Sequence, residues 1–243
     1  MISTSSAFLR ERTFDHVPIN LGYDDLSTIE LNEKRHYVIP TGTLKLQTYP
    51  SITTVLGHGK QFALENWRKR VGKIEADRVS RVACSRGESL HSLMERYLRN
   101  DEVIIDERTM PDALAMFRAI VPCINRHVGR IFLQERPLYS THLRVAGRTD
   151  LIAEWNGRLS VIDFKSSSRI KTRSDIKNYF MQEAAYAIMF EERTGIPIDR
   201  LVTLMAVDGQ SEALVFVENR DDWTDGLLKA IHAYERDHGT EGH

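Results

Sequence analysis

The second half of the chain carries the alternating and continuous apolar runs that are typical of β-strands, separated by turn signals. Strands are expected at about 130–136, 138–155, 158–165, 200–207 and 212–217. Helical periodicity predicts one helix between the third and fourth strands and another after the fifth, at 176–193 and 221–236. A meander, a crossover helix and a further strand predict an α/β fold with a central mixed sheet flanked by helices.

The first half is mainly helical in pattern and predicts a layer beside that sheet. Residues 1–35 are polar and irregular, which indicates an extension, and residues 36–48 predict a short hairpin around Thr41-Gly42. Helices are expected at 51–57, between an N-cap at Ser51 and a stop at Gly57, and at 60–71, 75–84, 87–99 and 110–127. The length of 243 residues fits one domain after the extension, with a helical part at 36–128 and a sheet-based core at 129–243.

The dipeptide Asn156-Gly157 favours a two-residue type I′ hairpin turn. Continuing that register places Asp150 directly opposite Asp163, with Cβ atoms about 4.5–5.5 Å apart. Two carboxylates at this separation repel each other, and a divalent cation between them would remove the penalty. Lys165 follows two residues after Asp163 and shares its face of the strand. Two acids and a lysine on one face of a hairpin predict a metal-dependent phosphodiesterase site.

Solvated acids on an edge strand are the simpler interpretation of Asp150 and Asp163. The flanking pairs Leu151-Ile152 and Val161-Ile162 argue against it, because they are apolar on both faces, as in a strand inside a sheet. An unpaired carboxylate there is costly, so a shared metal is the prediction. Phe164 should point to the opposite face, while its backbone carbonyl could also reach the cation.

Two predicted helices add polar residues at helical spacing. His91 and Glu95 lie one turn apart on the helix that begins at Gly87, although a lone histidine on a helix is usually not a ligand. Gln182 and Tyr186 are also four residues apart on the helix after the hairpin. Alone they carry no specific signal, but in a nuclease they would bind a phosphate or a base, or brace the lysine.

The net charge of −1 means that a nucleic-acid partner would be held by local basic patches. Basic residues concentrate at 60–86 and 165–177, and such runs are usually solvated faces. The second run directly follows the predicted site and contains three serine hydroxyls, which favours contact with a phosphate backbone. The candidate DNA-binding residues are Arg68, Arg70, Arg86, Arg148, Ser166, Ser167, Arg169 and Lys171.

Composition argues against several other classes of protein. The 2 cysteines are too few for a four-cysteine iron–sulfur cluster, so none is expected. No apolar run approaches the roughly 18 residues of a membrane helix, and the N-terminus lacks the apolar core of a secretory signal. We expect no membrane association and a cytoplasmic location.

Four short motifs together resemble the PD-(D/E)xK nuclease superfamily in its RecB-type branch. Each is weak alone, but their order is informative: Gly87-x-x-x-His91-x-x-x-Glu95, Gly147-x-x-Asp150, Asp163-Phe164-Lys165 and Gln182-x-x-x-Tyr186. The resemblance implies a restriction-endonuclease-like core and a metal-dependent deoxyribonuclease. It also implies that Lys165 is catalytic, that Gln182, Tyr186 and Glu95 support the site, and that Mg²⁺ or Mn²⁺ is held by His91, Asp150, Asp163 and the Phe164 carbonyl.

A further stretch is similar to the mitochondrial genome maintenance exonuclease and its bacteriophage relatives. It consists of Tyr49-Pro50-Ser51-Ile52-Thr53-Thr54-Val55-Leu56 and then Ala63-Leu64-x-x-Trp67-Arg68. That family cuts DNA from free ends and favours single strands, often threaded beneath a helical arch, here the helices at 51–99. The resemblance implies DNA with single-stranded ends as partner, and the lack of a transit peptide favours the cytoplasm of a bacterial cell or a phage-infected host.

Three alternatives remain open at the level of sequence. An endonuclease of restriction or junction-resolving type would use the same core. A non-catalytic DNA-binding protein would keep the fold, although the intact Asp–Asp–Lys set argues against it. An RNA substrate is also compatible with these residues. Strand polarity, oligomeric state and pathway, whether repair, recombination or replication, do not follow from the sequence.

Overall fold

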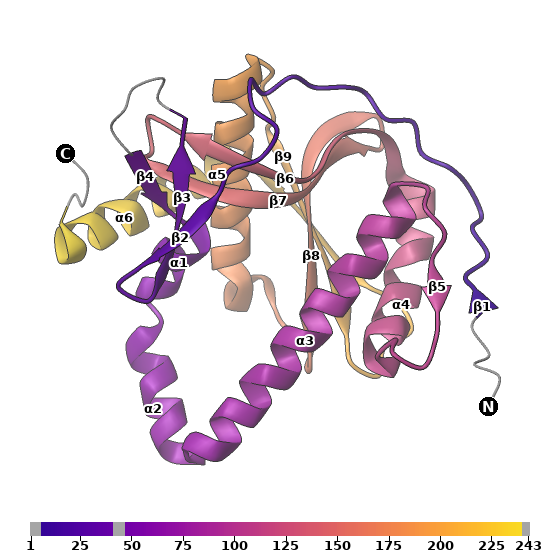
Figure 1. Ribbon diagram of the computed structural model, residues 1–243, viewed down its shortest axis with the longest axis horizontal. Helices are drawn as coiled ribbons and strands as arrows, with labels where there is room; N and C mark the ends of the chain where they lie inside the picture. The colour runs from indigo at the N-terminus through magenta and orange to yellow at the C-terminus, as the bar shows by residue number, and fades with distance from the viewer. Residues whose placement is uncertain (1–5, 41–46, 240–243) are drawn as a thin grey trace.

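The computed structural model describes residues 6–40 and 47–239, and its centre is a five-stranded mixed sheet in the order β10-β9-β8-β7-β6 (Figure 1). The strands are β6 (Val128–Ser140), β7 (Val145–Trp155), β8 (Arg158–Ser167), β9 (Arg200–Val207) and β10 (Leu214–Asn219). β6, β7 and β8 form an antiparallel meander, β9 runs parallel to β8, and β10 is antiparallel to β9. The predicted α/β class with a mixed sheet is confirmed.

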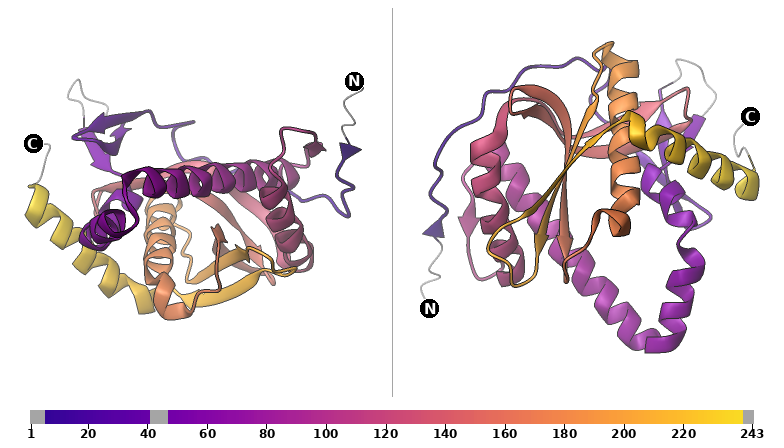
Figure 2. Two further views of the ribbon diagram at one scale, coloured as in Figure 1. Left: turned by 90° about the horizontal axis from the view of Figure 1, so that it is seen from below. Right: turned by 180° about the vertical axis from the view of Figure 1, so that it is seen from behind.

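Helices cover both faces of this sheet, as the view from below shows (Figure 2, left). They are α1 (Ile52–His58), α3 (Lys73–Leu98), α4 (Pro111–His127), α5 (Lys177–Thr194) and α6 (Asp221–His238), with a short 3-10 turn η1 (Arg173–Ile176) before α5. Alternate strand residues enter opposite cores. Ile152 packs with α1, α5 and α6, while its neighbour Leu151 packs with α3 and α4. Burial on both faces explains why β7 and β8 are apolar without alternation.

A second, three-stranded antiparallel sheet lies beside α1. It contains β2 (Thr28–Leu31), β3 (Lys34–Ile39) and β4 (Gln47–Pro50) in that order. The predicted hairpin is present as β3–β4, but its expected turn at Thr41-Gly42 lies outside the described residues. Ser51 is the N-cap of α1, as predicted, whereas the helix continues through Gly57 to His58.

Helix α2 (Gln61–Val71) and the first half of α3 project from the body as an arch, defined here as residues 61–85 (Figure 1). α2 contributes no buried residue. The prediction of two helices at 75–84 and 87–99 is wrong, because α3 is one helix through Gly87. A glycine ends a helix when it adopts a left-handed conformation, and Gly87 does not have a positive φ. Packing of the later apolar stripe, from Leu90 to Leu98, carries the helix through it.

The segment at 1–35, expected to be an irregular extension, contains two short strands among its described residues. β1 (Ser6–Ala7) pairs with β5 (Ile104–Ile105), and β2 belongs to the small sheet. Phe14, Leu21 and Leu26 are buried, so a few widely spaced apolar residues anchor a largely polar segment to the body. Such spacing has no periodicity, which is why the pattern did not reveal it. None of the described helices is long and apolar enough to cross a bilayer.

Candidate active site

The turn at Asn156-Gly157 sets the geometry of the β7–β8 hairpin. Both residues have positive φ, 51° and 75°, as a type I′ turn requires. The pairs from Trp155–Arg158 to Leu151–Ile162 follow the predicted register. The ladder stops one step before Asp150 and Asp163, where the Phe164 N–H instead donates a hydrogen bond of 2.8 Å to Asp150 Oδ2.

A third acid, which the sequence pattern did not reveal, lies on the other side of Asp150. Pairs Gln134–Leu151 and Arg136–Thr149 bracket Glu135 and Asp150, so these two acids face each other across β6 and β7. Glu135 has φ of 49°, which is strained for a residue with a side chain and is common at functional sites. The carboxylates of Glu135, Asp150 and Asp163 therefore form an acidic row across three adjacent strands.

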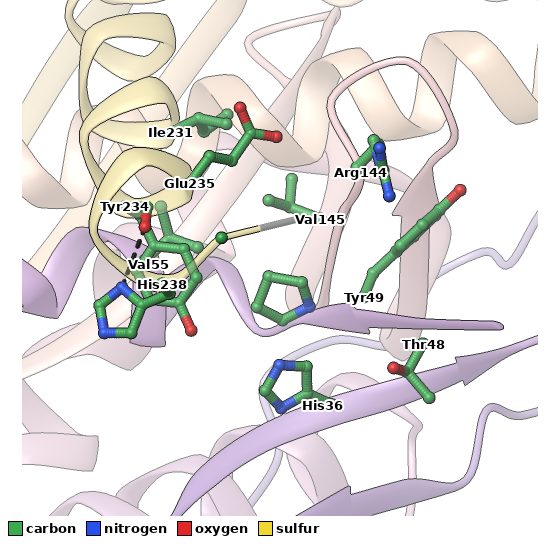
Figure 3. Close-up of a pocket in the computed structure, with 12 residues that line it drawn as sticks. His36, Thr48, Tyr49, Val55, Arg144, Val145, Ile231, Tyr234, Glu235 and His238 are labelled. Carbon is green, nitrogen blue, oxygen red and sulfur yellow. Dashed lines mark hydrogen bonds between the residues drawn. The ribbon is translucent and has the colours of Figure 1, made fainter. Parts of the chain in front are cut away.

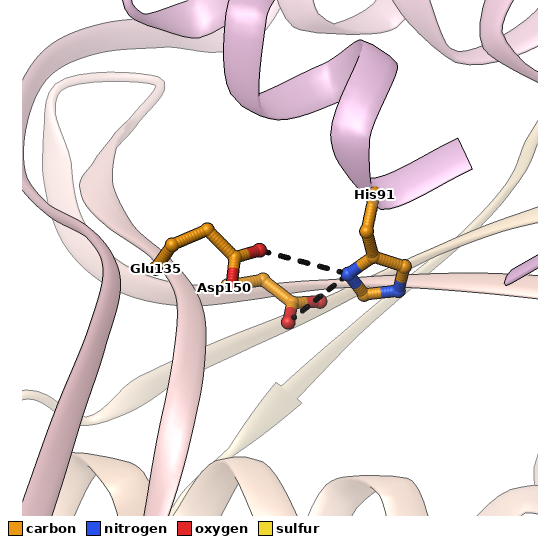
Figure 4. A group of neighbouring side chains, drawn as sticks. All are labelled: His91, Glu135 and Asp150. Atoms are coloured by element: carbon orange, nitrogen blue, oxygen red, sulfur yellow. Dashed lines mark ion pairs between the residues drawn. The ribbon is translucent and has the colours of Figure 1, made fainter. Parts of the chain in front are cut away.

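His91 approaches this row from α3 (Figure 4). Its Nδ1 lies 3.4 Å from Asp150 Oδ1 and 3.7 Å from Glu135 Oε1. Burial lowers the pKa of His91, but the charge of Asp150 and the contacts with both carboxylates outweigh burial and raise the pKa to about 10. Burial also raises the pKa of Glu135, which the charge of Asp150 reinforces. The imidazolium thus supplies the positive charge that two crowded acids require.

These residues fit a divalent cation. One ligand atom from each of His91, Glu135 and Asp150 can be chosen so that all three lie within 4.8 Å of one another. Carboxylate oxygens suit hard cations, and imidazole suits Mn²⁺ and other transition metals. The group shares His91 and Asp150 with the predicted ligand set, adds Glu135, and does not include Asp163 or the Phe164 carbonyl.

Asp163 is instead held by Lys165. The Lys165 ammonium forms an ion pair with Asp163 Oδ2 and lies 5.1 Å from the centre of the Tyr179 ring. Burial raises the pKa of Asp163; Lys165 opposes this and Asp150 adds to it, so that the pKa is about 6. Burial lowers the pKa of Lys165, but Asp163 and Asp150 raise it above its ordinary value. Lys165 therefore stays charged beside the acidic row.

Helix α5 supplies the predicted supporting residues. Gln182 Nε2 lies 3.4 Å from Asp163 Oδ1 and 3.2 Å from the Tyr186 hydroxyl. The next residue, Glu183, was not predicted. It is fully buried and accepts a hydrogen bond from Thr203, which pairs with Asp163 across β8 and β9. A helix pattern shows that one face is apolar, but it does not reveal an acid buried within that face.

The other predicted residues are more scattered. Glu95 pairs with Arg99 at 2.6 Å and is not part of the His91 group. Arg148 donates to the Glu135 carbonyl and to Asp25, so it braces the strained residue. Three of the remaining DNA-binding candidates have partners within the protein: Arg68 pairs with Asp77, Lys171 hydrogen-bonds Tyr179, and Ser167 donates to the Arg169 carbonyl. The others differ in exposure: Arg70 is exposed, Ser166 is half-buried and Arg86 is buried.

A separate pocket lies where β3 and β4 meet the end of α6, lined by residues that include His36, Tyr49, Arg144, Tyr234 and His238 (Figure 3). None of the predicted site residues lines it. The chemistry of the acidic row, rather than the shape of this pocket, identifies the candidate active site.

Comparison with known families agrees with this geometry. The model of the PD-(D/E)XK nuclease superfamily matches residues 61–237, which include α3, the acidic row and α5. The chain belongs to the PD-(D/E)XK nuclease superfamily. As a superfamily member it is a nuclease, with DNA as substrate and a divalent metal as cofactor, and its sheet and helices are consistent with the restriction-endonuclease-like core. A comparison with curated proteins finds no match.

Proposed function

We propose that this PD-(D/E)XK protein is a DNA exonuclease that cuts from free ends, prefers single strands and uses Mg²⁺ or Mn²⁺. The observation that carries the proposal is the acidic row beside His91 and Lys165, at the point where the arch joins the body. The motif resemblance to the RecB-type branch, and to the mitochondrial genome maintenance exonuclease and its phage relatives, supports the same assignment.

His91, Asp150 and Glu135 would hold the cation. Asp163 lies alongside, and the Phe164 carbonyl belongs to the next residue of β8. The cation supplies charge neutralisation at the phosphate and Lewis acidity. Crowded acids gain most from it, because their mutual repulsion disappears when it binds. With a cation held there, the charge of the His91 imidazolium would no longer be required, and His91 would act as a ligand in its neutral form.

Lys165 contributes in two ways. Its ammonium offsets the negative charge that builds on the scissile phosphate, and it orients the attacking water. Asp163 fixes the lysine through their ion pair, and Gln182 fixes Asp163 in turn. Tyr186 supports that amide, so these two α5 residues act as positioning residues.

The arch supports the preference for single strands. Residues 36–128, with the arch, form the DNA-binding part, and residues 129–243 form the catalytic core. A strand passing beneath helices would have to enter by its end, which favours exonucleolytic cutting. The exposed basic residues of the arch, such as Lys69 and Arg70, supply sequence-independent attraction for the phosphates.

The test compares end-labelled linear single-stranded DNA with its covalently closed circular form, in Mg²⁺, Mn²⁺ or EDTA. Metal-dependent loss of the linear form alone is expected, and 5′ and 3′ labels give polarity. Loss of both forms would indicate an endonuclease. If the protein left DNA intact but degraded RNA under the same conditions, its substrate would be RNA.

Variants tie the activity to the site. Asp163→Ala should abolish cleavage and spare DNA binding, whereas Asp112→Asn, at an exposed acid of α4, should leave both unchanged. Cleavage by Asp163→Ala at the wild-type rate would exclude this site as the catalytic centre.

A further inference from the structure

Arg86 is a buried charge without a counter-ion. Its residue is 8% exposed, and its Nε is buried with no hydrogen-bond partner among the residues that the structure describes. Within those residues no acid forms an ion pair with its guanidinium. A buried N–H without a hydrogen-bond partner costs free energy, which a bound acceptor would recover.

Other arginines near the site are engaged. Arg148 binds the Glu135 carbonyl and Asp25, Arg136 donates to the Tyr23 carbonyl, and Arg68 pairs with Asp77. Each of these guanidinium groups has at least one partner within the protein, although Arg136 Nε, like Arg86 Nε, is buried without one. Arg86 differs because no described residue forms a hydrogen bond or an ion pair with any nitrogen of its guanidinium.

Its position on α3 is close to the reacting groups. Arg86 opens the buried stripe that continues with Leu90 and Leu93, and the next residue, Gly87, starts the face that carries His91. A Cβ added to Gly87 would lie 4.0 Å from Ser166 Oγ. Ser166 directly follows Lys165 on β8, so Arg86 lies where the arch meets the catalytic strand.

Ser166 adds a second free donor. It shares the face of β8 that packs Phe164 toward α3, and no described residue hydrogen-bonds its hydroxyl. A guanidinium and a hydroxyl that both lack protein partners are a donor set for a phosphate. A nucleic-acid strand whose scissile phosphate lies at the acidic row brings further phosphates at regular spacing, and one of them can reach these donors.

We propose that Arg86 and Ser166 form a subsite for a phosphate of the substrate strand next to the scissile one, on the arch side of Lys165. This subsite rests on the proposed nuclease function and sets the register of the strand. Direct guanidinium contact there would fix which phosphodiester faces the acidic row.

The first test uses inorganic phosphate and does not depend on cleavage. Phosphate at constant ionic strength should raise the Tm of the wild-type protein and of Arg78→Gln, but not of Arg86→Gln. Arg78 is the matched control, because it is on the same helix, exposed and paired with Glu75. Equal shifts in all three proteins, or no shift in any, would overturn the proposal.

The second test locates the phosphate. In the Asp163→Asn background, a single-stranded oligonucleotide is neutralised by methylphosphonate at one position at a time. Neutralising one particular phosphate should weaken binding of the oligonucleotide on the order of ten-fold when Arg86 is present. The same neutralisation should not change binding to the Arg86→Gln variant. If every position costs the same with and without Arg86, the subsite does not exist.

Folding is checked in the same proteins. Removing an unpaired buried charge leaves stability equal or higher, so Arg86→Gln should match the wild type in urea without phosphate. A large loss of stability would show that Arg86 serves the fold and would overturn the proposal. A chain that neither binds nor cuts DNA, yet loses phosphate stabilisation in Arg86→Gln, would refute the nuclease function and leave the anion site intact.

Discussion

Asp150 is the residue on which the site is built, because it has a carboxylate on each side and an imidazole above it. Burial raises its pKa, but His91 and Lys165 outweigh burial and lower it, so Asp150 remains ionised. Both β-ladders of β7 omit it. The strands are not regularly paired at this point, and three acids come together there. Such a local loss of backbone pairing is common at functional sites.

The role of Glu135 can be measured directly. Glu135→Gln removes one charge of the row and should weaken Mn²⁺ binding about 10–100-fold. Isothermal titration calorimetry gives the affinity, and Glu88→Gln, at an exposed acid of α3, is the control. Unchanged Mn²⁺ affinity in Glu135→Gln would show that the cation does not depend on this carboxylate.

Gly147 allows Tyr186 to approach β7. A Cβ at this position would lie 2.8 Å from Tyr186 Cε1 and 3.0 Å from Ile52 Cγ2. Gly147→Ala should therefore destabilise the protein by about 1–3 kcal/mol in urea unfolding. Gly57→Ala, which meets nothing within 4 Å inside helix α1, should instead stabilise it by about 0.5–1 kcal/mol. Equal stabilities for the two variants would contradict the close approach.

At the scale of elements, α5 and β9 share the buried Glu183–Thr203 contact beneath the acidic row. Burial and the charge of Asp163 raise the pKa of Glu183 well above its ordinary value of 4.5. Above pH 4.5 the folded state therefore keeps a proton that the unfolded state loses. Stability falls as pH rises through that window, because the folded state binds more protons.

Glu183→Gln removes this titration and should flatten the pH dependence. The free energy of unfolding of the wild type relative to the variant should fall by up to about 1.4 kcal/mol per pH unit above the ordinary glutamate value. Urea unfolding at several pH values between about 5 and 8 measures that difference. A difference that is constant with pH would mean that Glu183 ionises normally in the folded protein.

At the scale of the whole molecule, the features that could be predicted from the sequence are those that a local turn determines. Asn156-Gly157 was sufficient to predict the β7–β8 register, because few other dipeptides favour two positive φ values. Glu135 was missed because its partner depends on the turn at 141–144. There Arg144 has φ of 54° without a glycine or asparagine to signal it. The continuity of α3 and the burial of Arg86 depend on tertiary packing, which no local pattern contains.

The arch provides the last prediction, since it contributes charge and, apart from Ala76, no buried residue. α2 buries no residue, so Lys69→Ser with Arg70→Ser should leave stability in urea nearly unchanged. The same double variant should bind single-stranded DNA more weakly, with the slope of log affinity against log salt reduced by about 0.7 for each phosphate that these side chains neutralise. Arg108→Ser with Arg118→Ser, at exposed sites outside the arch, should keep the wild-type slope. If the two double variants change the slope equally, the attraction is spread over the whole surface and DNA is not guided beneath the arch.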